Sequence, residues 1–193
     1  MSEWITNFTY KIEKQAVKTG LVYKFACGYY RDVIEKEIAL ANITAKDHIL
    51  CIGGGICPFS AILFHQITGA KVTVIDNNET CIPKARQAIK RLKISDDVQI
   101  FHQEGDSAAI QFSDYSVVHL ALQIHPIEQV FDSVKKHMLP GTKLLVRRPR
   151  GQLCGMYDSL STDLFACLAY TMHKARNIKT TVLYTKPIEA GAC

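Results

Sequence analysis

Three consecutive glycines, Gly53, Gly54 and Gly55, follow a short apolar run and precede Pro58. Because glycine has no Cβ atom, such a turn can bend tightly and bring its backbone close to a ligand. Asp76 ends the next apolar run, near the offset of about 20 residues at which a carboxylate accepts hydrogen bonds from ribose hydroxyls. Together they indicate an adenosine-type ligand. The alternative is a glycine turn that only joins a strand to a helix.

Pro58 argues against a dinucleotide as this ligand. The fingerprint G-x-G-x-x-G needs a third glycine at this position. Proline also removes an N–H from the helix start at which a pyrophosphate would bind, so a nicotinamide-dependent oxidoreductase is disfavoured. The Gly105-Asp106-Ser107 loop follows the next predicted strand and would face the same crevice, unless it is an ordinary turn.

Two tyrosines and one histidine are candidates for the chemistry. Tyr29 and Tyr30 lie at the start of a predicted helix, where they could cover a ligand and relay a proton through a hydroxyl. Tyr30 fits the apolar face of that helix equally well. His125 is a candidate general base, because imidazole changes its protonation near neutral pH. Its alternative interpretation is a solvated loop residue before Pro126.

An arginine run, Arg147, Arg148 and Arg150, lies at the carboxyl end of the predicted fifth strand. Arginine binds carboxylates through two parallel hydrogen bonds, so Arg147 and Arg150 predict a small acidic acceptor. A solvated basic rim is the alternative. The chain carries a net charge of only +5, and no aromatic stripe accompanies the arginines, which argues against a nucleic-acid partner.

Composition places the chain among single globular domains, with 193 residues, 48% hydrophobic and 21% charged. No apolar run reaches the roughly 20 residues of a membrane-spanning helix, and the N-terminus lacks a secretory signal, so we expect a cytoplasmic protein. The seven cysteines contain no C-x-x-C pair and the histidines are scattered. We therefore expect reduced thiols and no metal site.

Short apolar runs alternate with segments of helical periodicity. Strands are predicted at 48–52, 71–76, 98–101, 116–122, 143–147 and 180–184, and helices at 30–41, 58–69, 82–93, 126–134 and 158–169. This alternation predicts an α/β, Rossmann-like, doubly wound and mostly parallel sheet with helices on both faces. Residues 1–45 would form a helical arm or lid on a ligand-binding domain of residues 46–193.

The motif series from residue 49 to residue 107 resembles the class I S-adenosylmethionine-dependent methyltransferases. The resemblance implies that the glycines face the methionine part of that cofactor and that Asp76, followed by Asn77, binds its ribose. Asp106 and Ser107 would bind its adenine. Gln123 and His125 would lie beside the sulfonium and the acceptor. The family's usual first acidic residue and last glycine are replaced here by Cys51 and Cys57.

At these positions the sequence is similar to the nicotianamine synthases. The shared features are the turn at 51–60, the upstream Phe25, Tyr29-Tyr30-Arg31 and Glu37, and the later 145–148 run followed by Gly151. That family transfers the aminobutanoyl group of the same cofactor and releases methylthioadenosine. We expect no counterpart of that family's N-terminal helical domain in the 193 residues given.

The leading hypothesis is methyl transfer from S-adenosylmethionine to a small carboxylate-bearing acceptor, with S-adenosylhomocysteine as the product. Aminobutanoyl transfer, with methylthioadenosine as the product, is the second. A noncatalytic binding or assembly subunit of the same fold is the third. Without a capping domain, the site could be completed by a second subunit, in a homodimer.

Overall fold

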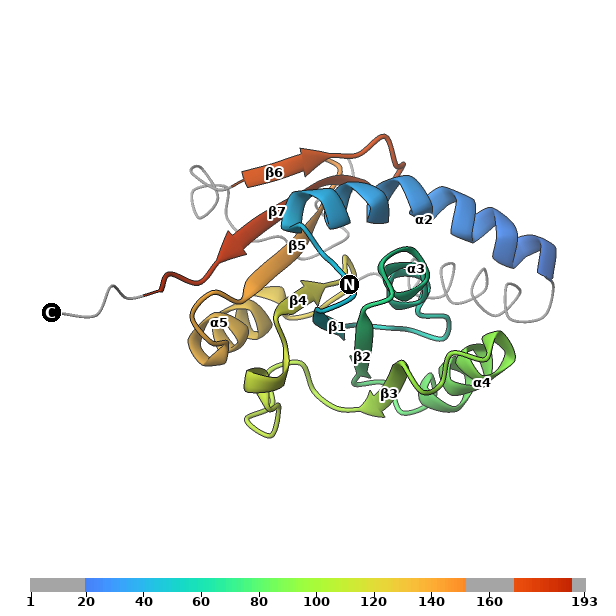
Figure 1. Ribbon diagram of the computed structural model, residues 1–193, viewed down its shortest axis with the longest axis horizontal. Helices are drawn as coiled ribbons and strands as arrows, with labels where there is room; N and C mark the ends of the chain where they lie inside the picture. The colour runs from blue at the N-terminus through green and yellow to red at the C-terminus, as the bar shows by residue number, and fades with distance from the viewer. Residues whose placement is uncertain (1–19, 152–168, 189–193) are drawn as a thin grey trace, which may run out of the picture.

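A seven-stranded sheet forms the centre of the computed structural model, which describes residues 20–151 and 169–188 (Figure 1). The strand order is β3-β2-β1-β4-β5-β7-β6. The strands are β1 His48–Ile52, β2 Lys71–Asp76, β3 Val98–His102, β4 Val117–Leu120, β5 Lys143–Pro149, β6 Ala169–Met172 and β7 Ile178–Thr185. The first five are parallel, and β7 and β6 join antiparallel at the β5 edge.

Helices cover both faces of this sheet (Figure 1). The helices α2 (Gly20–Ala41), α3 (Phe59–Thr68) and α4 (Ile82–Leu92) pack on one face, and α5 (Ile127–His137) packs on the other with the short 3₁₀ helix η1 (Phe112–Asp114). Four of the five residues of β1 and all of β4 are buried. Strands buried on both faces favour apolar residues at nearly every position, which explains why β1 and β4 are apolar apart from His48 and His119.

The strand order reverses beside β1, which lies between β2 and β4. In open α/β sheets, a crevice forms at such a point outside the carboxyl ends of the strands. The backbone at Gly54 passes very close to β2. A Cβ atom at this position would lie 2.3 Å from Val74 Cγ1, so a side chain would clash there. The glycine turn therefore lies directly against the sheet at the mouth of the crevice.

The fold class predicted from the sequence is confirmed. Each predicted strand is present, β1 and β2 with the predicted bounds and the others with shifts at their ends. Helix α3 ends where predicted, at Gly69, whose φ of +75° suits glycine. The strand β6 was not predicted, because its short sequence lies at a sheet edge and is mostly exposed. The helix predicted at 158–169 falls outside the described residues except for Ala169, which begins β6 instead.

Helix α2 begins at Gly20, earlier than the predicted 30–41 segment. Its residues Val33, Ile34 and Ala41 are buried, and Ile34 and Ala41 join the core cluster that contains β1 and α3. The described part of the predicted arm therefore shares a hydrophobic core with the sheet. The rest of the arm lies outside the described residues.

Cys51, Cys57 and Cys81 are buried, and none of them forms a disulfide within the described residues. Within 20–151 and 169–188, no helix combines the length and apolar character that a membrane span requires. The same ranges contain no group of three or more His, Cys, Asp or Glu side chains placed to hold a metal ion.

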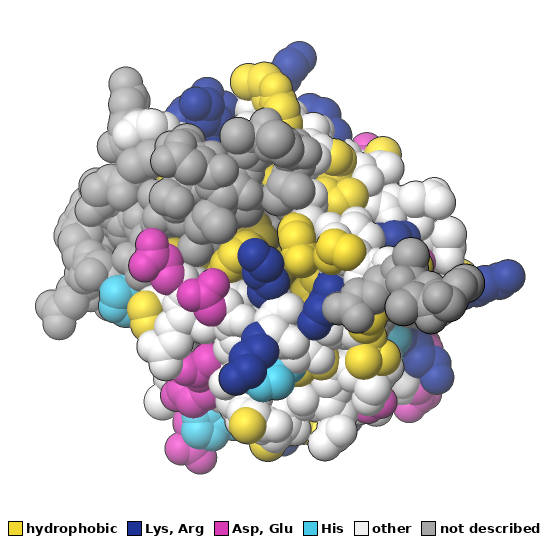
Figure 2. All heavy atoms as spheres, turned by 90° about the vertical axis from the view of Figure 1, so that its left-hand side faces the viewer, with side chains coloured by type: hydrophobic (Ala, Val, Ile, Leu, Met, Phe, Trp, Pro, Cys, Tyr) yellow, Lys and Arg dark blue, Asp and Glu magenta, His cyan; other side chains and the backbone are white. Residues whose placement is uncertain are grey.

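On the face shown in Figure 2, Lys and Arg side chains lie among acidic, histidine and hydrophobic ones.

Candidate functional site

A cavity of about 420 Å³ opens at the carboxyl ends of β1, β2 and β4. Its volume lies within the usual range for small-molecule sites, roughly 300–1,000 Å³. The glycine turn, the end of β2 and the loops after β3 and β4 form much of its wall. The remaining wall comes from α2, the start of α3, β5 and the start of β7.

The glycine turn and Asp76 are joined directly. Gly53 and Gly55 have φ values of +86° and +63°, in the left-handed region that favours glycine. The Gly53 N–H donates to the Ile75 carbonyl at 2.9 Å, and the Gly55 N–H donates to Asp76 Oδ2 at 2.7 Å. Asp76 Oδ1 accepts from the Asn78 N–H at 2.9 Å. Because a carboxylate offers about four lone-pair sites, Asp76 keeps acceptor capacity for a ligand.

The cavity brings together nine of the residues singled out from the sequence. They are Tyr30, Gly53, Gly54, Gly55, Asp76, Asn77, Gln123, His125 and Arg147. Their predicted contacts with a cofactor or an acceptor remain predictions, and the structure supplies the shared location that those contacts need. Four other predicted site residues, Asp106, Ser107, Tyr29 and Arg150, lie outside the described lining.

Asp106 and Ser107 are not among the residues that line the cavity, and their side chains have other partners. Asp106 accepts a hydrogen bond from Gln129 of α5, and Ser107 Oγ accepts from the Ala109 N–H at 3.2 Å. Gln103 and Glu104, directly after β3, line the cavity in their place. The adenine contacts of Asp106 and Ser107 stay predictions, and the residues of this loop that line the cavity are Gln103, Glu104 and Gly105.

Tyr29 and Arg150 hold the loop between β6 and β7. The Tyr29 hydroxyl donates to Asn177 Oδ1 at 2.6 Å and accepts from the Arg176 N–H at 2.8 Å. Arg150 donates to two carbonyls of the same loop, at 2.9 and 3.0 Å. Asn177 lines the cavity, so Tyr29 and Arg150 act on the site indirectly, by fixing the position of this loop.

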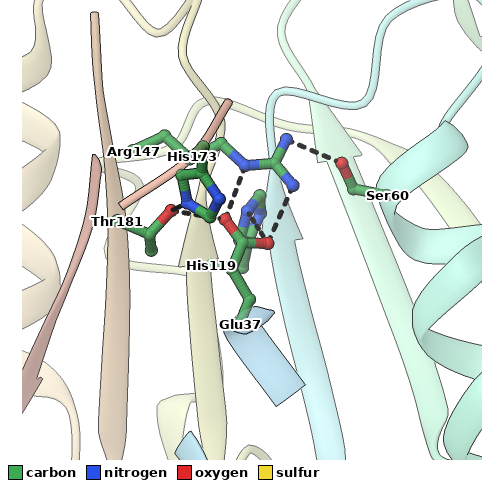
Figure 3. Close-up of polar contacts among 6 residues, drawn as sticks. All are labelled: Glu37, Ser60, His119, Arg147, His173 and Thr181. Atoms are coloured by element: carbon green, nitrogen blue, oxygen red, sulfur yellow. Dashed lines mark hydrogen bonds and ion pairs between the residues drawn. The ribbon is translucent and has the colours of Figure 1, made fainter. Parts of the chain in front are cut away.

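Arg147 is buried and already paired, which differs from the predicted arginine open to an acceptor carboxylate. Its Nε and Nη2 atoms each donate to Glu37 at 2.8 Å, and Nη1 donates to Ser60 Oγ at 2.9 Å (Figure 3). Its guanidinium carbon lies 5.9 Å from the centre of the Tyr30 ring, which stacks on Phe59 at 5.8 Å. The pairing arises because β5 carries Arg147 beneath α2, where an isolated charge would be costly.

A polar cluster surrounds this ion pair (Figure 3). The Thr181 hydroxyl donates to Glu37 Oε1 at 2.6 Å, and His173 Nε2 lies 2.8 Å from the same hydroxyl. Since Thr181 gives its only proton to Glu37, His173 Nε2 must be the donor to Thr181. His119 Nε2 lies 3.6 Å from Glu37 Oε2, beyond hydrogen-bonding distance.

The charges in this cluster are balanced. Burial alone would raise the pKa of Glu37, but the charge and hydrogen bonds of Arg147 hold it well below its usual range. Burial and the nearby charge of Arg147 lower the pKa of His119 to about 3. Burial also lowers the pKa of His173. At neutral pH the cluster therefore contains the Glu37 anion, the Arg147 cation and the neutral imidazole of His119. Burial also raises the pKa of the adjacent Cys51 thiol to about 12, so this thiol adds no charge.

From the sequence, Glu37 and Ser60 were noted only as parts of the resemblance to nicotianamine synthases, and no site role was assigned to Glu37, Ser60 or His119. A signal for Glu37 was available: it falls at helical spacing with the apolar residues Tyr30, Val33 and Ile34, so an acid occupies the buried face of a helix. His119 interrupts an otherwise apolar strand in the same way. A polar residue on an expected core face was therefore the useful indication.

No protein-family model matches the chain, and no curated protein matches it in sequence. Solved structures match its fold. A point mutant of MtNAS in complex with S-adenosylmethionine is 19% identical and superposes with a TM-score of 0.77, covering 96% of this chain and 76% of MtNAS.

Two methyltransferase structures are also similar. An RNA methyltransferase from Salinibacter ruber, in complex with S-adenosyl-L-homocysteine, is 18% identical over 82% of this chain and 92% of its own, with a TM-score of 0.64. A putative S-adenosyl-L-methionine-dependent methyltransferase from Methanococcus maripaludis is 12% identical over 95% of each chain, with a TM-score of 0.69. At these identities the similarity concerns the fold, and the chain has the class I S-adenosylmethionine-dependent methyltransferase fold.

Proposed function

We propose that this chain is a transferase that binds S-adenosylmethionine in the cavity beside β1 and transfers a group from it to a small-molecule acceptor. Methyl transfer is our first choice of reaction. The observation that carries the proposal is the contact between the glycine turn and Asp76, through the Gly55 N–H, at the reversal of strand order. This contact places a carboxylate and a ligand-accessible backbone at one side of the cavity.

The residues along the cavity fit such a cofactor. Asp76 and Asn77 lie at the end of β2, where they would hold the ribose hydroxyls. The carboxylate of Glu104 adds negative charge, which suits a cationic ligand. Ile75, Ile124 and Val130 supply apolar wall for an adenine ring. When bound, S-adenosylmethionine supplies a carbon already activated by its sulfonium.

The chain's own part in the reaction is to orient the acceptor, exclude water and receive a proton. The ring of Tyr30 stacks on Phe59 and forms part of the cavity wall, which shields the site on the α2 side. His125 and Tyr30 both line the cavity, and either side chain would take the proton that an amine or hydroxyl acceptor loses.

Aminobutanoyl transfer is the second candidate, and a specific observation favours it. The similarity to MtNAS extends over 96% of this chain, and the nicotianamine synthase motifs of the sequence map to the glycine turn, to α2 and to Arg147. A noncatalytic binding subunit remains the third candidate.

Identification of the nucleoside product separates these candidates. The protein is incubated with S-adenosylmethionine and a panel of amino acids, and the nucleosides are resolved by chromatography. Methyl transfer yields S-adenosylhomocysteine, and aminobutanoyl transfer yields methylthioadenosine. Neither product above the level of an Asp76→Ala control would contradict both reactions and leave the binding subunit.

A further inference from the structure

We propose that His119 is a ligand-binding residue and that, with Arg147 and Ser60, it forms a subsite for an α-amino acid group at the inner wall of the cavity. This inference rests on the proposed function and names the chemical group that the inner wall recognises.

The starting observation is an unsatisfied side chain. His119 is 1% exposed, and neither of its ring nitrogens has a hydrogen-bond partner among the described residues. Burying a polar group without a partner costs about 1–3 kcal/mol, so nearly all buried polar groups are paired. His119 lies among the residues that line the cavity, and less than 1 Å² of either ring nitrogen is accessible, so a ligand that binds this side chain must shift the inner wall slightly.

The surroundings of His119 decide what kind of partner this is. The ring packs edge-on against Phe64 at 5.4 Å, and its Nε2 atom faces the carboxylate of Glu37 at 3.6 Å. A proton on Nε2 is favoured next to that carboxylate, which leaves Nδ1 as a bare acceptor. The imidazole is neutral, as the lowered pKa requires. The missing partner of Nδ1 is therefore a hydrogen-bond donor, such as an amino group.

Arg147, in contrast to His119 Nδ1, calls for a hydrogen-bond acceptor. Three of its five N–H groups donate to Glu37 and Ser60, and two remain without an acceptor among the described residues. The guanidinium lines the same cavity. Its remaining donors suit a carboxylate oxygen, since charged N–H groups make the strongest hydrogen bonds with carboxylates.

Charge balance selects a ligand that carries both groups. Glu37 already compensates Arg147, so a lone carboxylate or a lone ammonium would add an unbalanced charge to a buried wall. A zwitterion brings its own compensation. Its amino group would donate to His119 Nδ1, and its carboxylate would accept from Arg147. An α-amino acid group is the simplest ligand with both groups on one carbon.

Two molecules of the proposed reaction could supply this group: the methionine end of the cofactor, or an amino acid acceptor. Titration calorimetry separates them. S-adenosylhomocysteine and methylthioadenosine share the adenosine part, and only the first carries an α-amino acid group. Both are titrated into the wild-type protein, His119→Phe and His119→Asn. His48→Phe is the control, because it alters a half-buried histidine at the other end of β1.

If the subsite holds the cofactor's methionine end, His119→Phe lowers the affinity for S-adenosylhomocysteine at least tenfold. The affinity for methylthioadenosine falls less than twofold. His119→Asn recovers part of the loss, because its amide can place an acceptor near the position of Nδ1. His48→Phe changes neither affinity. If the subsite holds the acceptor, both nucleosides bind His119→Phe normally. Amino acids that bind the wild-type complex with methylthioadenosine then bind the variant at least tenfold more weakly.

Two results would contradict a role of His119 in ligand binding. His119→Phe could weaken the binding of both nucleosides equally, or it could leave the affinity for the nucleosides and for every amino acid unchanged. Thermal unfolding distinguishes a structural role of His119 from a role in ligand binding. Replacing an unpartnered imidazole with an apolar ring should leave the melting temperature equal or higher. Failure of the wild-type protein to bind either nucleoside would refute the proposed function itself, and this result is distinct from those above.

Discussion

The carboxylate of Glu37 and the guanidinium of Arg147 form a bidentate ion pair at 2.8 Å, although the two residues lie 110 positions apart. Glu37 is 0% exposed and Arg147 is 6% exposed. The pair joins α2 to β5 at the inner wall of the cavity. The N-terminal helix is therefore fixed to the strands that form the site by a charged contact as well as by apolar packing.

Removing one partner of this pair should be more damaging than removing both. Glu37→Met or Arg147→Met alone leaves a buried charge and should cost about 3–5 kcal/mol in the free energy of unfolding. The double variant should cost less than the worse single variant. Urea unfolding measures all three. The exposed pair Arg31 and Glu35 is the control, where double replacement should cost under about 1 kcal/mol. Additive losses at Glu37 and Arg147 would show that the two charges are not coupled.

His119 should give the protein an acid-sensitive stability. Its pKa in the folded state is about 3, below the ordinary value of 6.5, so the unfolded chain binds more protons between these values. Stability therefore falls as the pH drops below 6.5. Between pH 7 and pH 5, the wild-type protein should lose about 2 kcal/mol more than His119→Phe. Glu37 loses its own contribution only at lower pH, because its pKa is also held down. Equal losses in both proteins would contradict a neutral buried imidazole.

The sequence predicted the sheet well because its central strands are buried on both faces and read as continuous apolar runs. The glycine turn and Asp76 were found for a related reason, since backbone geometry limits which residues fit there. The positions of Asp106 and Tyr29 were not predictable in the same way. Their partners, Gln129 and Asn177, lie 23 and 148 positions away, and local patterns carry no information about such contacts.

Gly54 should be required for the packing of the turn rather than for flexibility. In Gly54→Ala, the added methyl would lie 2.3 Å from Val74 Cγ1, and the overlap should destabilise the fold by about 1–3 kcal/mol. Val74→Ala in the same protein should recover part of this loss. Gly28→Ala, in α2 with no atom within 4 Å of its added methyl, should instead stabilise by about 0.5–1 kcal/mol. A loss at Gly54 that Val74→Ala leaves unchanged would exclude the clash as its cause.

Tyr29 should control the loop before β7. Tyr29→Phe removes the hydroxyl that contacts Arg176 and Asn177 and keeps the ring. Hydrogen exchange should then increase at the Arg176 amide, while the strands of the sheet keep their protection. Because Asn177 lines the cavity, we expect the KM for the acceptor to rise while cofactor affinity stays within twofold. Unchanged exchange at this amide would show that other contacts hold the loop.

We expect S-adenosylmethionine to bind in the cavity that the glycine turn and Asp76 line together. Calorimetric titration of this compound into the wild-type protein, Asp76→Ala and Asp47→Ala tests the claim most directly. Asp47 is the control because its carboxylate also caps backbone, before β1. We predict saturable binding at one site per chain, at least tenfold weaker in Asp76→Ala and unchanged in Asp47→Ala. No binding by the wild-type protein up to millimolar concentration, or equal affinity in Asp76→Ala, would contradict the account.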